Sequence, residues 1–297
     1  MAKYCINKYP KGSLPNQRTA GRYIDGYLYN NIEILARNIV KDITYLGVIF
    51  SSTYEVGSGK STLAQQIGEC YTELINNING FNIEFTAKNI CFRPKDLIEL
   101  AFKVPQYSVI ILDEWDDFHY WSELGTTLRE FFRKCRQLNL FIVIIIPNFF
   151  QLNIGYAISR SLFAIDVKFA AEFDRGFFDF YNFDNKKDLY IKGKRFYNYN
   201  AAKPNFNGRF LDGYPVGRNE YLKKKRDDLA RYEDQDGKKE ITERSINTKI
   251  FHKLRFYFKD ITLKTWAEAF CVSERTLNNW LADEKKAIEG LFPANAK

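Results

Sequence analysis

Short, almost wholly apolar runs recur along this chain and limit the folds that it can adopt. Tyr45 to Phe50, Ser108 to Leu112 and Phe141 to Ile146 are apolar at nearly every consecutive position, so both faces of each predicted strand need to be covered. Strands of this kind are typical of parallel sheets that carry helices on both faces. The sequence therefore predicts an α/β body.

Segments with other periodicities lie between and after these strands. Isoleucine and leucine recur at helical spacing from Tyr29 to about residue 43, and Pro94 favours the start of another helix. Further helices are predicted at 61–77 and 121–138, and further strands at 81–92 and 162–169. Aromatic and polar residues alternate over 176–197 around the sequence DNKKD, which predicts a β-hairpin.

These patterns divide the chain into four segments. Residues 1–28 hold basic residues and turn formers without a clear period, which predicts an extended N-terminal arm or, alternatively, a frayed terminus. Residues 29–217 form the α/β domain with the hairpin as an extension, and residues 218–245 a charged linker with a solvated helix. Residues 246–297 predict a small, all-helical C-terminal domain.

Composition excludes several classes of protein. The chain has 297 residues and 45% hydrophobic content, so it is neither disordered nor collagen-like. Its five cysteines are widely spaced and include no C-x-x-C pair, which argues against a disulfide framework and a zinc knuckle. No apolar signal region is present, and no apolar run approaches the roughly 20 residues that span a bilayer. We therefore expect a cytoplasmic protein without a membrane span.

A glycine-rich loop lies between the strand that ends at Phe50 and the next predicted helix. It consists of Gly57, Ser58, Gly59, Lys60, Ser61 and Thr62. Glycines let backbone N–H groups turn toward phosphate oxygens, the helix N-terminus adds a positive dipole, Lys60 can reach the β- and γ-phosphates, and Ser61 can ligate Mg²⁺. The loop resembles the Walker A motif of P-loop NTPases, which implies ATP as ligand. Tyr54 replaces the first glycine of that motif, and a surface turn is the alternative interpretation.

An acidic pair supports the phosphate-binding interpretation. The strand Val109 to Leu112 leads into Asp113 and Glu114, which resembles a Walker B motif. An Asp at the carboxyl end of a buried strand beside the loop is placed to hold Mg²⁺ through water, and Glu114 to orient or deprotonate the attacking water. A strand end with two solvated acids is the alternative.

The strand predicted between the two motifs, together with Glu114, resembles the additional-strand, catalytic-glutamate branch of P-loop ATPases. This resemblance implies a RecA-like fold. In that branch the strand after Walker B commonly ends in a polar sensor that touches the γ-phosphate or the attacking water. The sequence FIVIIIPN puts Asn148 at this position, where a polar turn after Pro147 is the alternative.

Residues 43–169 show a narrower resemblance. The stretch LREFFRKCRQLNLFIVIIIPN is similar to the helix and sensor strand of the FtsK/HerA superfamily, which includes zonular occludens toxin-like (Zot-like) and virus-packaging ATPases. Members form homo-oligomeric rings in which a basic residue stabilises the transition state at the neighbouring subunit's γ-phosphate. The resemblance implies Arg133, Arg136 or Arg160 for this role, and a solvated or Glu130-paired helix face is the alternative. The chain departs from Zot-like proteins in lacking a predicted membrane span, and from FtsK/HerA pumps in having Asn148 where Gln is more frequent.

A second motif lies near the C-terminus. In TLKTWAEAFCVSERTLNNWL, from Thr262 to Leu281, two short helices are predicted, with Ser273 as the N-cap of the second. The spacing resembles a DNA-binding helix-turn-helix in which Cys271 replaces the usual turn glycine. This resemblance implies that the second helix enters the major groove. The implied DNA contacts are Ser273, Arg275, Thr276, Asn278 and Asn279. A helical hairpin used for packing or protein contact is the alternative.

The distribution of charge agrees with two phosphate-bearing partners. The net charge is +8, and residues 218–297 carry half of it with 18 basic and 14 acidic side chains. Together the motifs predict an ATP-hydrolysing, ring-forming DNA motor of a virus or mobile element, acting in packaging, transfer or replication. The alternatives are an ATP-switched, sequence-specific DNA-binding regulator or replication initiator, and a transposition-type ATPase.

Overall fold

The structure is a computed structural model, and it describes residues 5–7, 23–53, 57–115, 123–169, 176–236, 250–251, 254–255, 258 and 261–281. At 5–7, 123, 229 and 231–236 the description covers the backbone alone. The chain divides into two units, Met1–Asp228 and Leu229–Lys297, and each is described by itself.

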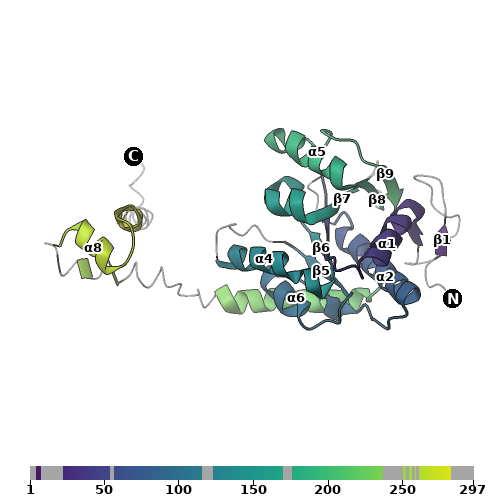
Figure 1. Cartoon of the computed structure of the whole chain (residues 1–297), viewed down its shortest axis with the longest axis horizontal. Coiled ribbons are helices and arrows are strands. Elements are labelled where there is room, and N and C mark those ends of the chain that lie inside the picture. The colour runs from purple at the N-terminus through teal and green to yellow at the C-terminus, as the bar shows by residue number, and fades with distance from the viewer. Residues whose placement is uncertain are drawn as a thin grey trace, which may run out of the picture. The chain divides into compact units, whose positions relative to one another are not determined.

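A seven-stranded sheet forms the centre of the first unit (Figure 1). Its strands lie in the order β4, β5, β6, β3, β7, β8, β9. Their bounds are β3 Tyr45–Phe50, β4 Ile90–Cys91, β5 Val109–Asp113, β6 Phe141–Ile145, β7 Ser161–Lys168, β8 Phe177–Tyr181 and β9 Phe206–Arg209. The first five strands in this order are parallel to one another. Strand β8 pairs with β7, and β9 with β8, in antiparallel orientation. The predicted α/β body is confirmed, and its sheet is parallel over five of the seven strands.

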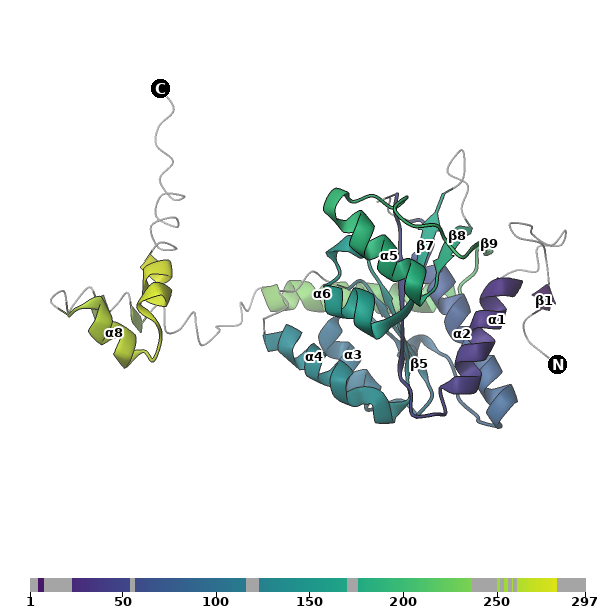
Figure 2. The same ribbon diagram turned by 45° about the horizontal axis from the view of Figure 1, so that its top comes forward.

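Helices cover both faces of this sheet, as Figure 2 shows. The bounds are α1 Gly26–Asn38 and α2 Lys60–Asn79 on one face, and α3 Pro94–Ala101, α4 Glu123–Lys134 and α5 Phe183–Gly193 on the other. Successive strand residues alternate between the two cores: Ile49 and Ile145 face α1 and α2, whereas Val48 and Ile144 face α3, α4 and α5. This double burial explains the continuous apolar runs. Within the described ranges, no helix has the length and apolarity needed to cross a membrane.

Identifiable residues mark several helix ends. Asp25, the last residue of β2 (Tyr23–Asp25), caps α1 by accepting hydrogen bonds from the N–H groups of Tyr27 and Leu28, at 2.9 and 3.2 Å. Pro94 occupies the first turn of α3, where its missing N–H costs nothing. These local signals fix where α1 and α3 begin.

The predicted hairpin over 176–197 is wrong in its second half. After β8 the chain forms α5 and then a 3₁₀ turn, Lys194–Phe196. The Asn182 side chain caps α5 by accepting a hydrogen bond from the N–H of Asn185 at 2.9 Å. The polar sequence that suggested a turn therefore starts a helix, and Leu189 of this helix is buried against the sheet.

The strand predicted over 81–92 is also corrected, because only β4 forms. The Asn76 side chain bonds both backbone groups of Ile83, at 2.9 and 2.8 Å, so a side chain occupies groups that a neighbouring strand would otherwise pair. A 3₁₀ turn, Ala87–Asn89, follows. The β-branched and aromatic residues of this stretch pack on the core without forming a ladder.

Two predicted domain boundaries move. The folded part begins before residue 29, because Tyr23 and Ile24 are buried and α1 starts at Gly26. Residues 218–236 form a charged helix, α6 (Arg218–Asp236), as predicted, but its first half is no solvated linker. Tyr221 of α6 is 4% exposed and belongs to the core on the α1 and α2 face.

The second unit has a small aromatic core. Helix α8 (Leu263–Ala269) is followed by a turn and by helical residues 274–281. The buried core residues are Phe251, Trp266, Ala267, Leu277 and Trp280. Cys271 in the turn has a φ of 52°, a left-handed conformation that glycine adopts most readily. This is the position at which the sequence predicts a replaced turn glycine.

Gly47 of β3 lies against the Phe163 ring on β7, and a Cβ at position 47 would come within 2.4 Å of that ring. We expect Gly47→Ala to lower the free energy of unfolding by about 1–3 kcal/mol, because the added methyl overpacks this contact. Chemical denaturation of Gly47→Ala, Phe163→Leu and the double variant Gly47→Ala/Phe163→Leu measures the effect. In the double variant the smaller leucine should recover part of the stability lost in Gly47→Ala. Strictly additive losses of stability would show that the contact is not the cause.

Candidate functional site

Most of the residues predicted to bind phosphate and metal gather at the carboxyl edge of the sheet. Strands β3, β5, β6 and β7 are parallel, so their carboxyl ends meet at one edge. The Gly57–Thr62 loop follows β3, Asp113 ends β5, and Asn148 comes shortly after β6. Crevices at the carboxyl ends of parallel strands are where open α/β sheets bind ligands.

The glycine-rich loop has the backbone that its composition predicts. Gly57 and Gly59 have φ values of 86° and 98°, at which a residue with a side chain would be strained. Helix α2 starts directly after Gly59. A Cβ on Gly59 would also come within 2.9 Å of the Phe210 ring, so the loop passes closely beneath that residue. The loop therefore aims the N-terminus of α2 at the carboxyl edge. Tyr54, at the position of the missing glycine, lies outside the described residues.

Lys60 is a partly buried cation among acidic groups. Its Nζ donates to the Ser58 hydroxyl at 3.4 Å. Burial lowers the pKa of Lys60, the negative charges of Asp113 and Asp166 oppose this effect, and the positive charge of Lys225 adds to it. The ammonium group thus lies within electrostatic reach of the carboxylates on β5 and β7.

Ser61 and Asp113 join the loop to β5. The Ser61 hydroxyl donates a hydrogen bond to Asp113 Oδ1 at 3.1 Å, and the Tyr221 hydroxyl donates to Oδ2. Asp113 is 2% exposed, and burial raises its pKa, while the bonds from Tyr221 and Ser61 act in the opposite direction. A serine hydroxyl beside an aspartate carboxylate is a donor set that fits Mg²⁺, which prefers one or two carboxylates together with water and phosphate oxygens.

Glu114 leaves the end of β5 in an unusual conformation. Its φ is 85°, a region that side chains disfavour, while the next residue, Trp115, is held by its N–H bond to the Ile145 carbonyl at 2.9 Å. Its carboxylate is half exposed and forms an ion pair with Lys225 of α6. The strained turn directs the carboxylate away from the buried strand and toward solvent and α6.

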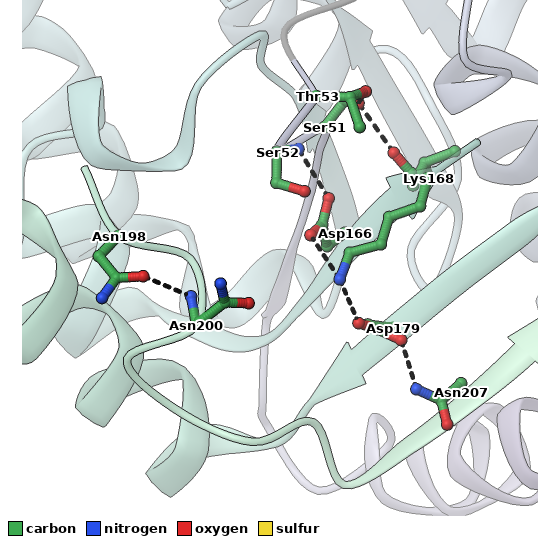
Figure 3. A network of polar contacts seen from close by, with 10 residues as sticks. Ser51, Ser52, Thr53, Asp166, Lys168, Asp179, Asn198, Asn200 and Asn207 are labelled. Atoms are coloured by element: carbon green, nitrogen blue, oxygen red, sulfur yellow. Dashed lines mark hydrogen bonds and ion pairs between the residues drawn. The ribbon is translucent and has the colours of Figure 1, made fainter. Parts of the chain in front are cut away.

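A chain of polar and charged groups extends from Ser52, just after β3, across β7 and β8 to β9, as Figure 3 shows. Asp166 accepts a hydrogen bond from the Ser52 N–H at 2.8 Å, and its other oxygen lies 3.5 Å from Lys168 Nζ. Lys168 also bonds Asp179 at 2.5 Å, and Asn207 donates to Asp179. Burial raises the pKa of Asp166 to about 6 despite the opposing charge of Lys168.

Asn148 is engaged in the fold. Its side-chain oxygen accepts hydrogen bonds from the Phe150 N–H at 2.9 Å and from the Tyr199 hydroxyl at 2.7 Å. These bonds hold the 3₁₀ turn Phe149–Gln151 after β6. This geometry is what the alternative interpretation, a polar turn after Pro147, expects.

The three candidate arginines separate into two places. Arg133 and Arg160 line one pocket of about 400 Å³, together with Arg129, between α4 and the π-helix Gly155–Arg160. Arg160 directly precedes β7, so this pocket reaches the amino end of that strand, opposite the edge that carries the loop. Arg136 does not line the pocket, and its Nε donates to the Asp42 carbonyl at 2.6 Å.

The residues predicted to contact DNA lie around the second helix of the C-terminal unit. Ser273 caps it by accepting from the Thr276 N–H at 3.2 Å, and the two hydroxyls bond each other at 2.9 Å. Arg275, Asn278 and Asn279 are exposed, whereas Leu277 and Trp280 of the same helix are buried. The predicted contacts therefore occupy one solvent-facing side of a helix whose other side forms the core.

Sequence reasoning missed three residues at the carboxyl edge. Asp166 carried a signal, because it is a carboxylate inside the apolar run LFAIDV. Tyr221 and Lys225 carried none, since a charged segment far along the chain gives no indication of which edge it packs on.

No protein-family model, curated protein or solved structure matches this chain. Its function is therefore inferred from the chemistry of the carboxyl edge and of the C-terminal unit.

Asp166 gives a prediction for the pH dependence of stability. Its pKa rises from an ordinary 3.8 to about 6 in the fold, so the folded state binds more protons between these values and stability falls as pH rises through that window. From pH 4 to 7 the stability of Asp166→Asn relative to wild type should increase by up to about 3 kcal/mol. Denaturant titrations at several pH values measure this change.

The control is Asp188→Asn, which removes an exposed carboxylate of α5 paired with Lys192 at 2.7 Å. This variant should follow the wild-type pH profile. A stability difference between Asp166→Asn and wild type that does not vary with pH would contradict the assignment.

Proposed function

We propose that this protein is an ATP-hydrolysing DNA motor with a RecA-like P-loop core. The observation that carries the proposal is the 3.1 Å hydrogen bond from Ser61 to Asp113, beside Lys60 at the N-terminus of α2. It joins a phosphate-binding type of loop to a strand-end carboxylate. The mostly parallel sheet with helices on both faces is compatible with this core.

Each residue at the carboxyl edge has a role in this proposal. Bound ATP would supply the reactive γ-phosphorus, and bound Mg²⁺ the cation that neutralises the negative charge developing on the phosphates. The loop N–H groups and Lys60 would hold the phosphates, and Ser61 and Asp113 the metal. Glu114 would accept the proton of the attacking water. Asn148 would act through its amide nitrogen, because its oxygen is already bonded to Phe150 and Tyr199.

The arginine-lined pocket supports a ring. Because Arg160 precedes β7, it lies at the edge of the sheet opposite the glycine-rich loop. From there it would not reach a phosphate bound by the loop of the same subunit. Arg133 lines the same pocket. In a homo-oligomeric ring either side chain would reach the γ-phosphate of a neighbouring subunit, as the FtsK/HerA resemblance implies. The bond of Arg136 to a backbone carbonyl makes it the weakest of the three candidates.

The C-terminal unit would supply the contact with DNA. Two short helices joined by a tight turn agree with a helix-turn-helix, and exposed Arg275, Asn278 and Asn279 are residue types that hydrogen-bond guanine and adenine edges. A motor that translocates on any sequence has little need of base-reading side chains. This observation favours a second candidate function, a sequence-specific regulator or initiator that ATP switches.

Variants of the carboxyl edge test the hydrolytic function. Lys60→Ala should abolish ATP binding, because it removes the only side-chain cation of the loop. Glu114→Gln should bind ATP normally and lower DNA-stimulated turnover by about 10² to 10⁴-fold, because it removes the proton acceptor. Steady-state phosphate release with and without single- and double-stranded DNA measures this, with the exposed Glu99→Gln as control. A slow rate indifferent to DNA would favour the switched regulator.

Variants of the C-terminal unit test DNA binding. Arg275→Ala should weaken binding to a preferred duplex by about 1–3 kcal/mol and relax sequence preference, because the bidentate contact is lost. Lys264→Ala on α8, also exposed, should cause only a small, sequence-independent and salt-dependent loss. Fluorescence anisotropy at several salt concentrations measures both. Equal effects of the two variants on all sequences would contradict base reading.

A further inference from the structure

The first half of α6 is fixed to the carboxyl edge by contacts along one side of the helix. Lys224 donates to the Ala87 carbonyl at 2.7 Å, and Asp228 pairs with Arg93 at 3.2 Å. Tyr221 bonds Asp113, as described above. Since Lys225 comes four residues after Tyr221, the two side chains extend from the same face of the helix. The helix thus presents a hydroxyl and an ammonium group side by side to Asp113, which ends β5, and to Glu114, which follows it.

Lys225 lies within the electrostatic environment of the phosphate loop. Its ammonium pairs with Glu114, and its positive charge acts to lower the pKa of both Asp113 and Lys60. Burial by itself would lower the pKa of Lys225, but the bond to Glu114 and the charge of Asp113 raise it above the ordinary value. The group is therefore a cation at neutral pH. Two ammonium groups, from Lys60 and Lys225, thus interact electrostatically with the same carboxylate, Asp113.

We propose that Lys225 binds the γ-phosphate of ATP and, in doing so, releases Glu114 from their ion pair. The proposal rests on the ATPase function proposed above. It makes Lys225 a second phosphate-binding cation, supplied by α6 of the same subunit. Lys225 would be paired with Glu114 whenever the γ-phosphate is absent and with the phosphate whenever it is present.

The exchange follows from charge and from the geometry of lysine. The ammonium sits on a flexible four-carbon chain and has three donors, so it can change partner while α6 stays in place. A γ-phosphate carries more negative charge than one carboxylate, so its arrival favours transfer of the cation. As long as the Lys225 ammonium is paired with Glu114, it occupies the carboxylate that would receive the proton of the attacking water. Transfer of Lys225 to the γ-phosphate therefore frees this carboxylate only when the scissile phosphate is bound.

The test compares a nucleotide with a γ-phosphate to one without. Titration with a non-hydrolysable β,γ-imido analogue of ATP and with ADP gives the two dissociation constants directly. Lys225→Ala should weaken binding of the analogue by about 10-fold or more and change ADP affinity by less than about twofold, since a charged hydrogen bond to the γ-phosphate is lost. Lys225→Arg should restore part of the preference. Lys223→Ala, an exposed lysine of the same helix, should behave as wild type.

Retained ADP binding shows that Lys225→Ala folds and keeps its phosphate loop. If analogue and ADP affinities both match wild type, Lys225 does not touch the γ-phosphate and the inference is wrong while the ATPase function stands. If Lys225→Ala raises basal hydrolysis and leaves the preference for the analogue unchanged, Lys225 is an inhibitory clamp on Glu114, which also overturns the inference. If the wild-type chain binds neither nucleotide, the proposed function itself fails.

Discussion

The hydrogen bond between Ser61 and Asp113 joins two parts of the chain that the sheet holds at the same level. In the parallel register Asp113 of β5 is opposite Ile145 of β6, which is opposite Ile49 of β3. The loop that leaves β3 therefore meets the carboxylate across one intervening strand. Burying a carboxylate to 2% exposure is costly unless hydrogen bonds satisfy its oxygens. Ser61 satisfies one oxygen and Tyr221 the other, so the acid depends on both the loop and α6.

The core of this arrangement could be predicted because its signals are local. Buried parallel strands need continuous apolar runs, and the left-handed backbone before α2 needs glycines, so both are visible in the sequence. The predictions were wrong where a side chain hydrogen-bonds the backbone of a residue several positions away, and where a polar residue is compatible with either a turn or a helix cap. Asn182 could start a turn or cap a helix, and the structure shows the cap. Asn76 bonds both backbone groups of Ile83, which no periodicity of residues 81–92 could reveal.

Long-range packing accounts for the remaining differences. A charged helix packs on a sheet edge only if that edge carries groups that its side chains can bond. Which groups lie at the edge depends on the fold and cannot be read from one sequence. Here the edge offers two carboxylates and two backbone carbonyls, and α6 supplies a hydroxyl and two ammonium groups that bond them. The charges of α6 that suggested a linker are the groups that fix it to the core.

The docking of α6 has a consequence for what counts as the smallest working piece of this protein. The seven-stranded sheet is complete at the end of β9, Arg209, so a fragment cut there would keep all the strands of that sheet, the glycine-rich loop and both acids. It would nonetheless lose the hydroxyl that bonds one oxygen of Asp113 and the cation that neutralises Glu114. Two negative charges at adjacent positions would then repel each other at the edge of the sheet. The self-sufficient unit of this chain extends at least as far as Asp228, past the point at which its sheet is complete.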